Sequence, residues 1–340
     1  MIVAAEAAPR EVGPVELLVA GDAVPDLVLG DIAGELAFGQ GDNLVERGVL
    51  TVGGSSAIMA CGAARLGLRV GFVGVFADDA AGRFMLEELK SRGIDVSACV
   101  VLPRETTAVC VHLVRSGAER DRAMISWRGC DHDLTAAMVR PALVESVRHV
   151  HVGSFYLLHK LAPSLAGLFS DARAAGCTTS LDPQGDPEGR WGMGLREVLR
   201  ETDIFFPNQN EALAVAASVG AAPSGVVDER VLEILAALGP LPVVKCGAEG
   251  AISRDGKSVV RAGAMRAVPV DTIGAGDSFD AGFVYGHMQG WPVDRSLAFA
   301  VACGSLSTRA AGGVEAQASV AEALAASTDS RAVRLSVQEA

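Results

Sequence analysis

Short apolar segments alternate with helical patterns along most of this 340-residue chain, and the alternation limits the folds that the sequence can adopt. Residues 15–20 and 69–77 are apolar runs typical of buried strands, and helical patterns follow them at 53–66 and 79–89. Further strands are expected at 149–152, 178–181, 203–206 and 242–245, with helices at 162–175, 211–217 and 229–238. Strands that alternate with helices form a parallel sheet. The sequence therefore predicts an α/β fold with a mostly parallel central sheet.

Two segments interrupt this alternation. Residues 27–50 contain glycines among alternating apolar residues, and residues 106–127 are typical of two strands paired around a turn. We expect these segments to form a small sheet beside the central one. Because no repeat or low-complexity linker divides the chain, we expect one domain over residues 15–326, with flexible tails at 1–14 and 327–340.

The composition excludes several classes of function. A net charge of −12 and a pI near 5.0 argue against a nucleic acid as the main partner. The sequence has no run of 18 uncharged apolar residues, so we expect no membrane span, and residues 1–14 lack the pattern of a signal peptide. The seven cysteines are scattered without a CxxC pattern, which is typical of reduced thiols in a cytoplasmic protein.

A glycine-rich turn at residues 274–276 lies between an apolar run that ends near Val270 and a helical pattern that begins at Asp277. The N–H groups of such a turn converge at the helix N-terminus, where the helix dipole favours an anion, most often a phosphate. A carboxylate there stays ionised and can accept a proton from an alcohol. Two other interpretations stay open. Asp277 is a favoured N-cap residue, and the two glycines match part of a dinucleotide fingerprint whose third glycine position Phe279 fills.

Residues 271–277, Asp-Thr-Ile-Gly-Ala-Gly-Asp, resemble the C-terminal signature of the ribokinase-like (PfkB) carbohydrate kinases. The resemblance extends over about residues 15–325 and implies a three-layer α/β/α sandwich with a small β lid formed by residues 27–50 and 106–127. It implies that Gly274, Ala275 and Gly276 form an anion hole and that Asp277 is the base on the substrate hydroxyl. Thr272, Gly274 and Gly276 would then also contact ATP.

Asn208 and Glu211 are about one helical turn apart, and local rules favour a capping box with Asn208 as the N-cap. The spacing also matches the NxxE motif of the family, which orders Mg²⁺ and phosphate oxygens, largely through water. The resemblance further implies that Lys245, Gly247 and Gly250 lie at the ATP. In several members of the family, a segment similar to residues 308–313 offers carbonyls to K⁺ together with the region of Asp271.

On the substrate side, Asp26 falls where the family keeps an aspartate that binds sugar hydroxyls. Gly53 and Gly54 resemble the glycine pair beside which the sugar lies, and we assign Ser55, the next residue, to the substrate as well. The chain departs from the pattern at Ile58, where the family usually has an asparagine that reads a sugar hydroxyl, so the identity of the sugar is open. Strand alternation places Cys110 and His112 on one face, and we expect His112 to contact the substrate if that face points inward.

Together these features predict an ATP-dependent phosphotransferase that acts on an alcohol group of a sugar or sugar-like polyol and uses ATP and Mg²⁺. A nucleoside kinase of the same family is an alternative, which a large apolar pocket around Phe155 and Trp127 would favour. A catalytically silent, ligand-binding regulator on this fold is another. A nicotinamide dehydrogenase fits poorly because the chain lacks an early GxGxxG motif. Open edges and apolar surface on the small sheet suggest a homodimer formed through the lid.

Overall fold

A computed structural model of the protein describes residues 13–336 except 33–34, 37, 40, 116–121, 144–145, 190, 193, 222, 224, 266–268 and 329–331. Nine strands form its central sheet in the order β15-β14-β13-β12-β11-β10-β9-β1-β4. The strands are β1 (Leu17–Ala20), β4 (Val70–Val73), β9 (His149–Val152), β10 (Thr178–Leu181), β11 (Ile204–Phe205), β12 (Leu241–Lys245), β13 (Ala251–Asp255), β14 (Ser258–Ala262) and β15 (Ala332–Ser336). Pairs from β4 to β12 are parallel and the remaining pairs are antiparallel, which confirms the mostly parallel sheet.

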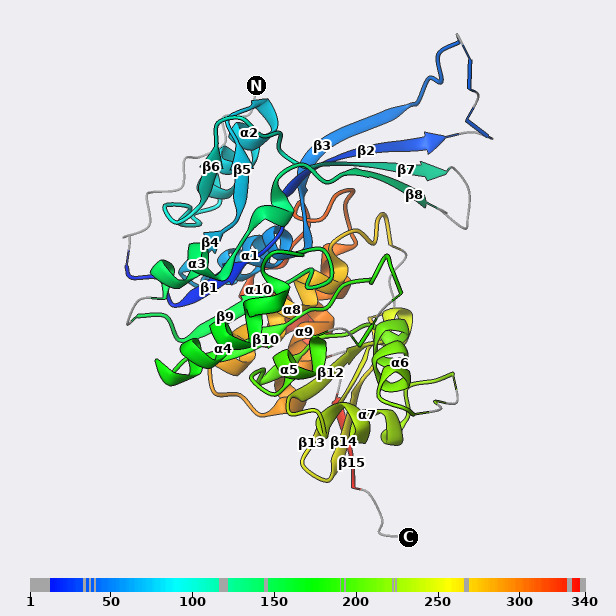
Figure 1. Cartoon of the computed structure of the whole chain (residues 1–340). Helices are drawn as coiled ribbons and strands as arrows, with labels where there is room; N and C mark the ends of the chain where they lie inside the picture. The colour runs from blue at the N-terminus through cyan, green and yellow to red at the C-terminus, as the bar shows by residue number, and fades with distance from the viewer. Residues whose placement is uncertain are drawn as a thin grey trace.

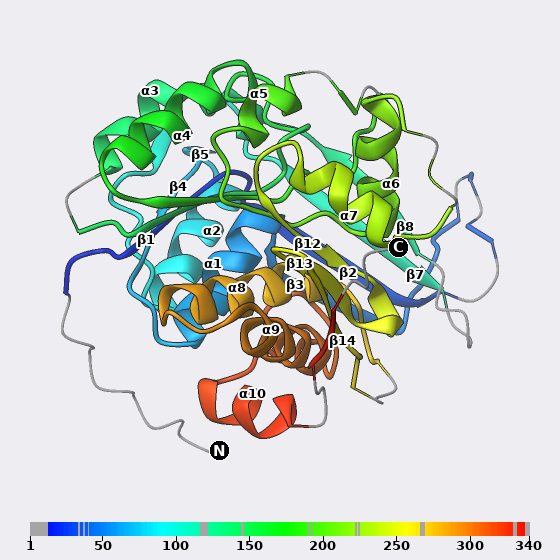
Figure 2. The same cartoon turned by 90° about the horizontal axis from the view of Figure 1, so that it is seen from below.

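Helices cover both faces of this sheet, as Figure 2 shows from below. One layer contains α1 (Ser55–Arg65), α2 (Ala80–Ser91), α8 (Ala275–Met288), α9 (Val293–Ser307) and α10 (Val320–Ser327). The other contains α3 (Ala136–Val139), α4 (Leu165–Ala174), α5 (Leu195–Leu199), α6 (Gln209–Ser218) and α7 (Glu229–Ala236). Short 3₁₀ helices are η1 (Asp131–Asp133), η2 (Arg140–Ala142), η3 (Ala162–Ser164) and η4 (Gly247–Glu249). Each layer buries its own apolar cluster against the sheet, so the fold is the expected three-layer sandwich.

Small residues let α8 approach its neighbours closely, and this contact fixes the helix that begins at the glycine-rich turn. A Cβ added to Gly282 on α8 would lie 2.9 Å from the Cys303 Sγ on α9. A Cβ added to Gly62 on α1 would lie 3.0 Å from the Ala281 Cβ on α8. Because close-packed interiors leave no room for such atoms, both glycines set the spacing of the three helices.

Four strands form a separate sheet that projects from the body (Figure 1). This small sheet has the order β3 (Arg47–Gly53), β2 (Val24–Ile32), β7 (Val109–Arg115) and β8 (Arg122–Trp127), and both segments predicted to lie outside the central sheet supply its strands. Its register pairs Asp26 with Thr51 on one side and with Cys110 on the other. A further pair joins β5 (Val75–Ala77) and β6 (Val100–Leu102), so the expected strand 69–77 is divided between two sheets.

The two central strands of the small sheet, β2 and β7, alternate in burial over much of their length. Asp26, Cys110 and His112 are buried on one face, as the alternation predicted for the last two. Leu50, Ile125 and Trp127 lie on the outer face, and the Trp127 side chain is 64% exposed. The small sheet therefore has an apolar face that the described residues leave uncovered.

The C-terminal segment differs from the expectation of a tail over residues 327–340. Ser327 ends α10, and residues 332–336 form β15, which pairs with β14 at the edge of the central sheet. The pairing becomes possible because β14 presents an open edge, a property that no local pattern in residues 332–336 encodes. Most of the expected N-terminal tail, residues 1–12, lies outside the described residues.

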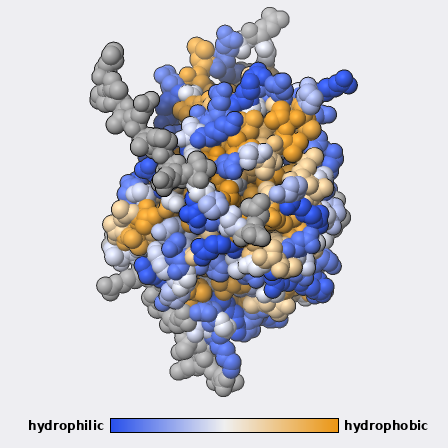
Figure 3. Space-filling model, turned by 90° about the vertical axis from the view of Figure 1, so that its left-hand side faces the viewer, coloured by the Kyte–Doolittle hydropathy of each residue, from blue (hydrophilic) through white to orange (hydrophobic). Residues whose placement is uncertain are grey.

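The described helices include none that combines the length and apolar character needed to cross a bilayer. Figure 3 shows one side of the molecule, where apolar side chains gather in patches bordered by hydrophilic ones. All seven cysteines are free, as expected for reduced thiols.

Candidate active site

The glycine-rich turn forms the start of α8. Gly274 is its N-cap with φ of 69°, and a Cβ there would lie 2.8 Å from the Gly313 Cα, so only glycine fits. Ala275 and Gly276 are the first two helical residues, and Asp277 follows them in the first turn. The first N–H groups of a helix have no partner within it, so this turn directs free donors and the positive end of the dipole to one point.

Asp277 is buried and is held by Ser55 at the start of α1. The Ser55 hydroxyl donates to Asp277 Oδ1 at 2.6 Å. Asp22, directly after β1, fixes this helix start because its carboxylate accepts from the backbone N–H groups of Ser55 and Ser56. Burial and then the Asp182 charge raise the pKa of Asp277 to about 7, although the Ser55 hydrogen bond and Lys245 lower it. A carboxylate with such a pKa exchanges a proton near neutral pH.

Beneath Asp277 lies a buried group of charges. The Lys245 Nζ, at the end of β12, contacts Asp182 Oδ2 at 2.6 Å and Asp280 Oδ2 at 3.1 Å. One oxygen each of Asp182, Asp277 and Asp280 lies within 4.8 Å of the others. Three ionised carboxylates this close would repel each other strongly, so the site needs compensating charge.

Lys245 and one proton supply that compensation. Burial lowers the pKa of Lys245, but Asp182, Asp280 and Glu211 outweigh burial and hold it above its usual range. Burial raises the pKa of both Asp182 and Asp280. At Asp182 the Lys245 charge together with hydrogen bonds from Asp280, Lys245 and the Gln184 N–H outweighs burial and lowers the pKa, while the pKa of Asp280 stays well above its usual value. The surroundings therefore favour the ionised form of Asp182, the protonated form of Asp280 and the charged form of Lys245.

A pocket of about 280 Å³ opens beside the start of α8. Six residues predicted at the ATP or anion hole line it, namely Lys245, Gly247, Gly250, Thr272, Ala275 and Gly276. Gly250 has φ of 92°, and a Cβ there would lie 2.0 Å from the Ala262 carbonyl oxygen, so the turn after β12 requires glycine. The remaining wall is largely apolar, with Met265, Phe279 and Val301, which sequence reasoning missed because they come from three separate segments. Gly274 and Asn208 do not line this pocket.

Asn208 and Glu211 form the capping box that local rules favoured. The Asn208 side chain accepts from the Glu211 N–H at 3.0 Å, and Glu211 accepts from the Asn208 N–H at 2.8 Å and from the Asn208 amide at 2.6 Å. Burial and then the Asp182 charge raise the pKa of Glu211 to about 7. Amide and carboxylate oxygens are the hard donors that Mg²⁺ takes, so Asn208 and Glu211 fit this ion. Since Asn208 already occupies both Glu211 oxygens, the fit is to a hydrated ion.

Asp271 connects the glycine-rich turn to the segment after α9. Its carboxylate accepts from the N–H groups of Ile273 and Gly312, each at 3.0 Å. The Val270 N–H donates to the Thr308 carbonyl at 2.8 Å. The carboxylate therefore orders the two backbone segments from which the resemblance expects K⁺ ligands.

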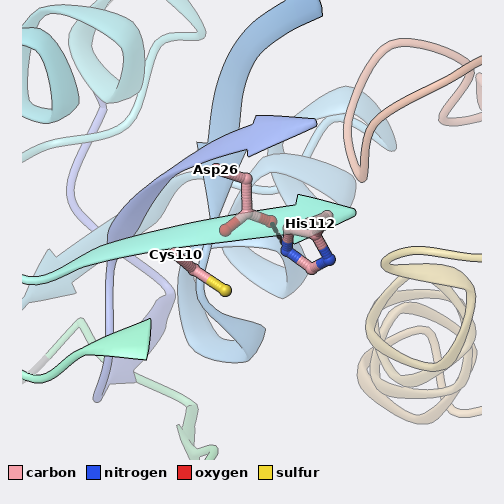
Figure 4. Close-up of side chains that lie close together, drawn as sticks. All are labelled: Asp26, Cys110 and His112. Atoms are coloured by element: carbon pink, nitrogen blue, oxygen red, sulfur yellow. Dashed lines mark ion pairs between the residues drawn. The ribbon is translucent and has the colours of Figure 1, made fainter. Parts of the chain in front are cut away.

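On the small sheet, Asp26 and His112 form a buried pair. Figure 4 shows Asp26, Cys110 and His112 together on neighbouring strands, and Asp26 Oδ2 lies 3.1 Å from His112 Nε2. Burial lowers the pKa of His112, but the hydrogen bonds and charges of Asp26 and Cys110 together outweigh burial, and the pKa rises to about 9. Gly53 lies against this pair, because a Cβ there would be 2.0 Å from Asp26 Cγ. The adjacent Gly54 precedes Ser55, which reaches Asp277, so this turn links the two groups of predicted residues.

Other sequence candidates lie elsewhere. Ile58 packs against the glycine-rich turn, since a Cβ on Gly274 would lie 2.8 Å from Ile58 Cγ2. Phe155 is buried in the core against Tyr156, and Trp127 lies on the outer face of the small sheet. Neither lines the pocket beside the start of α8. Asp280 was missed, although its position three residues after Asp277 on one helix face would have suggested it.

This chain is similar to known proteins over most of its length. The model of the pfkB family carbohydrate kinases matches residues 17–319. An ATP-dependent ribose-1-phosphate kinase of Halopiger xanaduensis is 29% identical over 255 residues, covering 75% of this chain and 79% of that protein. A 5-dehydro-2-deoxygluconokinase of Shouchella clausii is 29% identical over 272 residues, and a 2-dehydro-3-deoxygluconokinase of Bacillus subtilis is 27% identical over 272 residues. They cover 75% and 77% of this chain, and 79% and 82% of their own lengths.

Solved structures show the same fold. A putative ribokinase II from E. coli in complex with ATP and Mg²⁺ superposes with a TM-score of 0.78 at 22% identity, covering 93% of this chain and 99% of its own. Arabidopsis thaliana ribokinase, complexed with ribose and ATP, has a TM-score of 0.74 at 21% identity and covers 93% and 99%. The family match over residues 17–319 is the decisive finding: this chain belongs to the pfkB family of carbohydrate kinases.

Proposed function

We propose that this carbohydrate kinase uses Asp277 as the general base that takes the proton from a hydroxyl of its sugar-like acceptor. The observation that carries the proposal is the place of Asp277: a buried carboxylate with a pKa of about 7, at the positive end of α8 and beside the 280 Å³ pocket. A base is most effective when its pKa lies near the working pH. Ser55 holds the carboxylate in place at 2.6 Å.

ATP is the proposed phosphoryl donor, bound in the pocket beside Gly276. Its walls suit the two ends of a nucleotide, because Met265, Phe279 and Val301 offer apolar contact while the turn offers N–H groups to phosphates. The N–H groups of the 274–276 turn stabilise the negative charge on the transferred group. Asn208 and Glu211 would hold Mg²⁺ through water, and the ion would neutralise part of the phosphate charge. We also propose that the backbone near Asp271 and Thr308 holds K⁺.

The acceptor is proposed to lie between the start of α1 and the small sheet. Asp26 binds hydroxyls next to the one that reacts, Gly53 and Gly54 let the sugar approach, and Ser55 orients the base. The small sheet then acts as a lid that keeps water, a competing phosphoryl acceptor, out of the site. The names of the ribose-1-phosphate kinase and of the two deoxygluconokinases support a sugar derivative as the acceptor.

The alternatives receive less support. A nucleoside acceptor was tied to an apolar pocket around Phe155 and Trp127, and these two side chains lie in different parts of the molecule. A silent regulator would not need the Asp277–Ser55 hydrogen bond or a nucleotide pocket at the same helix. We further propose a cytoplasmic homodimer in which the outer faces of two small sheets cover each other, because Leu50, Ile125 and Trp127 are each more than half exposed there.

Replacing Asp277 with Asn tests the proposal, because it keeps the shape and removes the base. We expect kcat to fall by about 10²–10⁴-fold while ATP binding, followed by calorimetry, is retained. The assay couples ADP formation to NADH oxidation over a panel of pentoses, hexoses, sugar acids, sugar phosphates and nucleosides. Near-normal turnover by a correctly folded Asp277→Asn enzyme would refute the role of Asp277.

A further inference from the structure

We propose that His112 selects an acceptor sugar that carries an anionic group, a carboxylate or a phosphate, by donating to that group from the ring nitrogen that Asp26 does not use. The inference rests on the proposed function, since it concerns the acceptor side of the same site. It assigns to the acceptor a chemical class that neither the glycine-rich turn nor Asp26 defines.

The two ring nitrogens of His112 differ in their partners. His112 Nε2 lies 3.1 Å from Asp26 Oδ2, and Figure 4 shows the second ring nitrogen on the side of the ring away from Asp26. That second atom, Nδ1, is buried and has no hydrogen-bond partner among the described residues. The His112 side chain is only 6% exposed, so bulk water does not satisfy the atom freely. A buried polar atom without a partner costs free energy, and a bound ligand that pairs with it recovers that cost.

The charge of His112 also favours an anionic acceptor. With its pKa near 9, His112 is an imidazolium at neutral pH and both ring nitrogens carry protons. Nδ1 is therefore a charged donor, and the hydrogen bonds of charged donors are strongest with anionic oxygens. The Asp26 carboxylate cannot accept hydrogen bonds from both nitrogens, because these lie on different sides of the imidazole ring.

The charged groups around the acceptor site are mainly acids. Asp22 lies at the start of α1, Asp26 lies on β2, and Asp277 lies at the reacting end. Asp131 interacts electrostatically with Asp22, and its neighbours His132 and Arg128 lie on the same side, with Arg128 exposed to solvent. Lys245 is already enclosed by Asp182 and Asp280. An anionic sugar entering among these carboxylates needs a cation on its own side of the cleft. His112 provides one at the end of the acceptor that lies against β7, away from Asp277.

The test compares acceptors that differ by the charged group alone. D-Gluconate is paired with D-glucitol, and D-ribose 1-phosphate with D-ribose, so that the two arms separate a carboxylate from a phosphate. Binding to the native protein is measured by calorimetry without ATP, and it does not depend on catalysis. We expect the charged member of at least one pair to bind about 10-fold more tightly than its neutral partner, and equal or weaker binding of both charged members overturns the proposal.

Replacing His112 with Gln keeps a donor and removes the charge. We expect the kcat/KM of the charged acceptor to fall about 10-fold or more, because charge-assisted hydrogen bonds are about twice as strong as neutral ones. The kcat/KM of the neutral partner should fall by a clearly smaller factor, since it loses only the effect of His112 on Asp26. His159→Gln, an exposed histidine elsewhere on the surface, is the matched control. An equal loss of kcat/KM for both acceptors would mean that His112 only positions Asp26, and it would refute the selection of anionic acceptors by His112. If no acceptor yields ADP, the result counts against the proposed function instead.

Discussion

Removing the Ser55 hydroxyl should shift the pH dependence of this kinase, because that hydroxyl stabilises the ionised form of the proposed base. Ser55 Oγ donates to Asp277 Oδ1 at 2.6 Å in a buried setting, and the bond lowers the pKa of Asp277. The base must be ionised to accept a proton, so activity falls as the pH drops through the Asp277 pKa of about 7. In Ser55→Ala the carboxylate loses this donor and its pKa rises further.

The magnitude follows from the strength of hydrogen bonds to charged groups. Such a bond contributes about 1.5–3 kcal/mol, and one pKa unit corresponds to about 1.4 kcal/mol. The acid limb of kcat/KM should therefore move upward by about 1–2 pH units in Ser55→Ala. At pH 7 the variant should lose about 5- to 50-fold of its activity, because a shift of about 1–2 units lowers the ionised fraction of a base with a pKa of about 7 by that factor, and it should recover part of that loss at higher pH.

The measurement is the profile of kcat/KM against pH, which reports the ionisation of the free enzyme. Ser56→Ala is the matched control, because Ser56 is the neighbouring buried serine and its hydroxyl has no partner among the described residues. The control should keep the acid limb of the native enzyme. If the limb of Ser55→Ala coincides with that of Ser56→Ala, the hydrogen bond does not tune the base and the reasoning fails.

Four further changes probe the same site. Glu211→Gln should raise the Mg²⁺ concentration for half-maximal activity, since it removes charge near the hydrated ion; a lower melting temperature with an unchanged requirement would leave Glu211 a capping residue alone. Lys245→Met should lower the free energy of unfolding in urea by about 3–5 kcal/mol, because it leaves buried carboxylates without their cation. An unaltered midpoint of urea unfolding would contradict the charge balance described for Asp182 and Asp280. Ile58→Asn should destabilise the fold by about 1–3 kcal/mol without altering the ranking of acceptors, because Ile58 packs on Gly274; a changed ranking in the acceptor panel would place residue 58 at the sugar instead. Asp277→Asn should raise the melting temperature more at pH 8 than at pH 5. The folded-state pKa of Asp277, about 7, is higher than the unfolded-state pKa, so the native carboxyl lowers the stability as the pH rises from the unfolded-state to the folded-state value. An equal gain at both pH values would argue against the raised pKa.

Local patterns in the sequence were sufficient to predict most of the strands and helices. The strands at 149–152 and 178–181 have the predicted bounds, because each is a short run between polar turn residues and its burial needs no knowledge of distant contacts. The turn at 274–276 could also be predicted from the sequence, since a left-handed N-cap before a helix requires glycine at one position. The capping box of Asn208 and Glu211 depends on three residues of spacing alone.

Contacts between distant segments decided what the site residues do. Ser55 and Asp277 are 222 residues apart, and Lys245 lies 63 residues from Asp182, so no local pattern indicated that these side chains meet. Ile58 lies at the position where the family usually has a substrate-binding asparagine. The packing of α1 against the glycine-rich turn nevertheless places the Ile58 side chain against Gly274. The pair of Asp26 and His112 exists because β2 and β7 lie side by side in parallel register. Secondary structure follows from periodicities within a segment, whereas charge pairing and side-chain direction depend on which surfaces the folded core brings together.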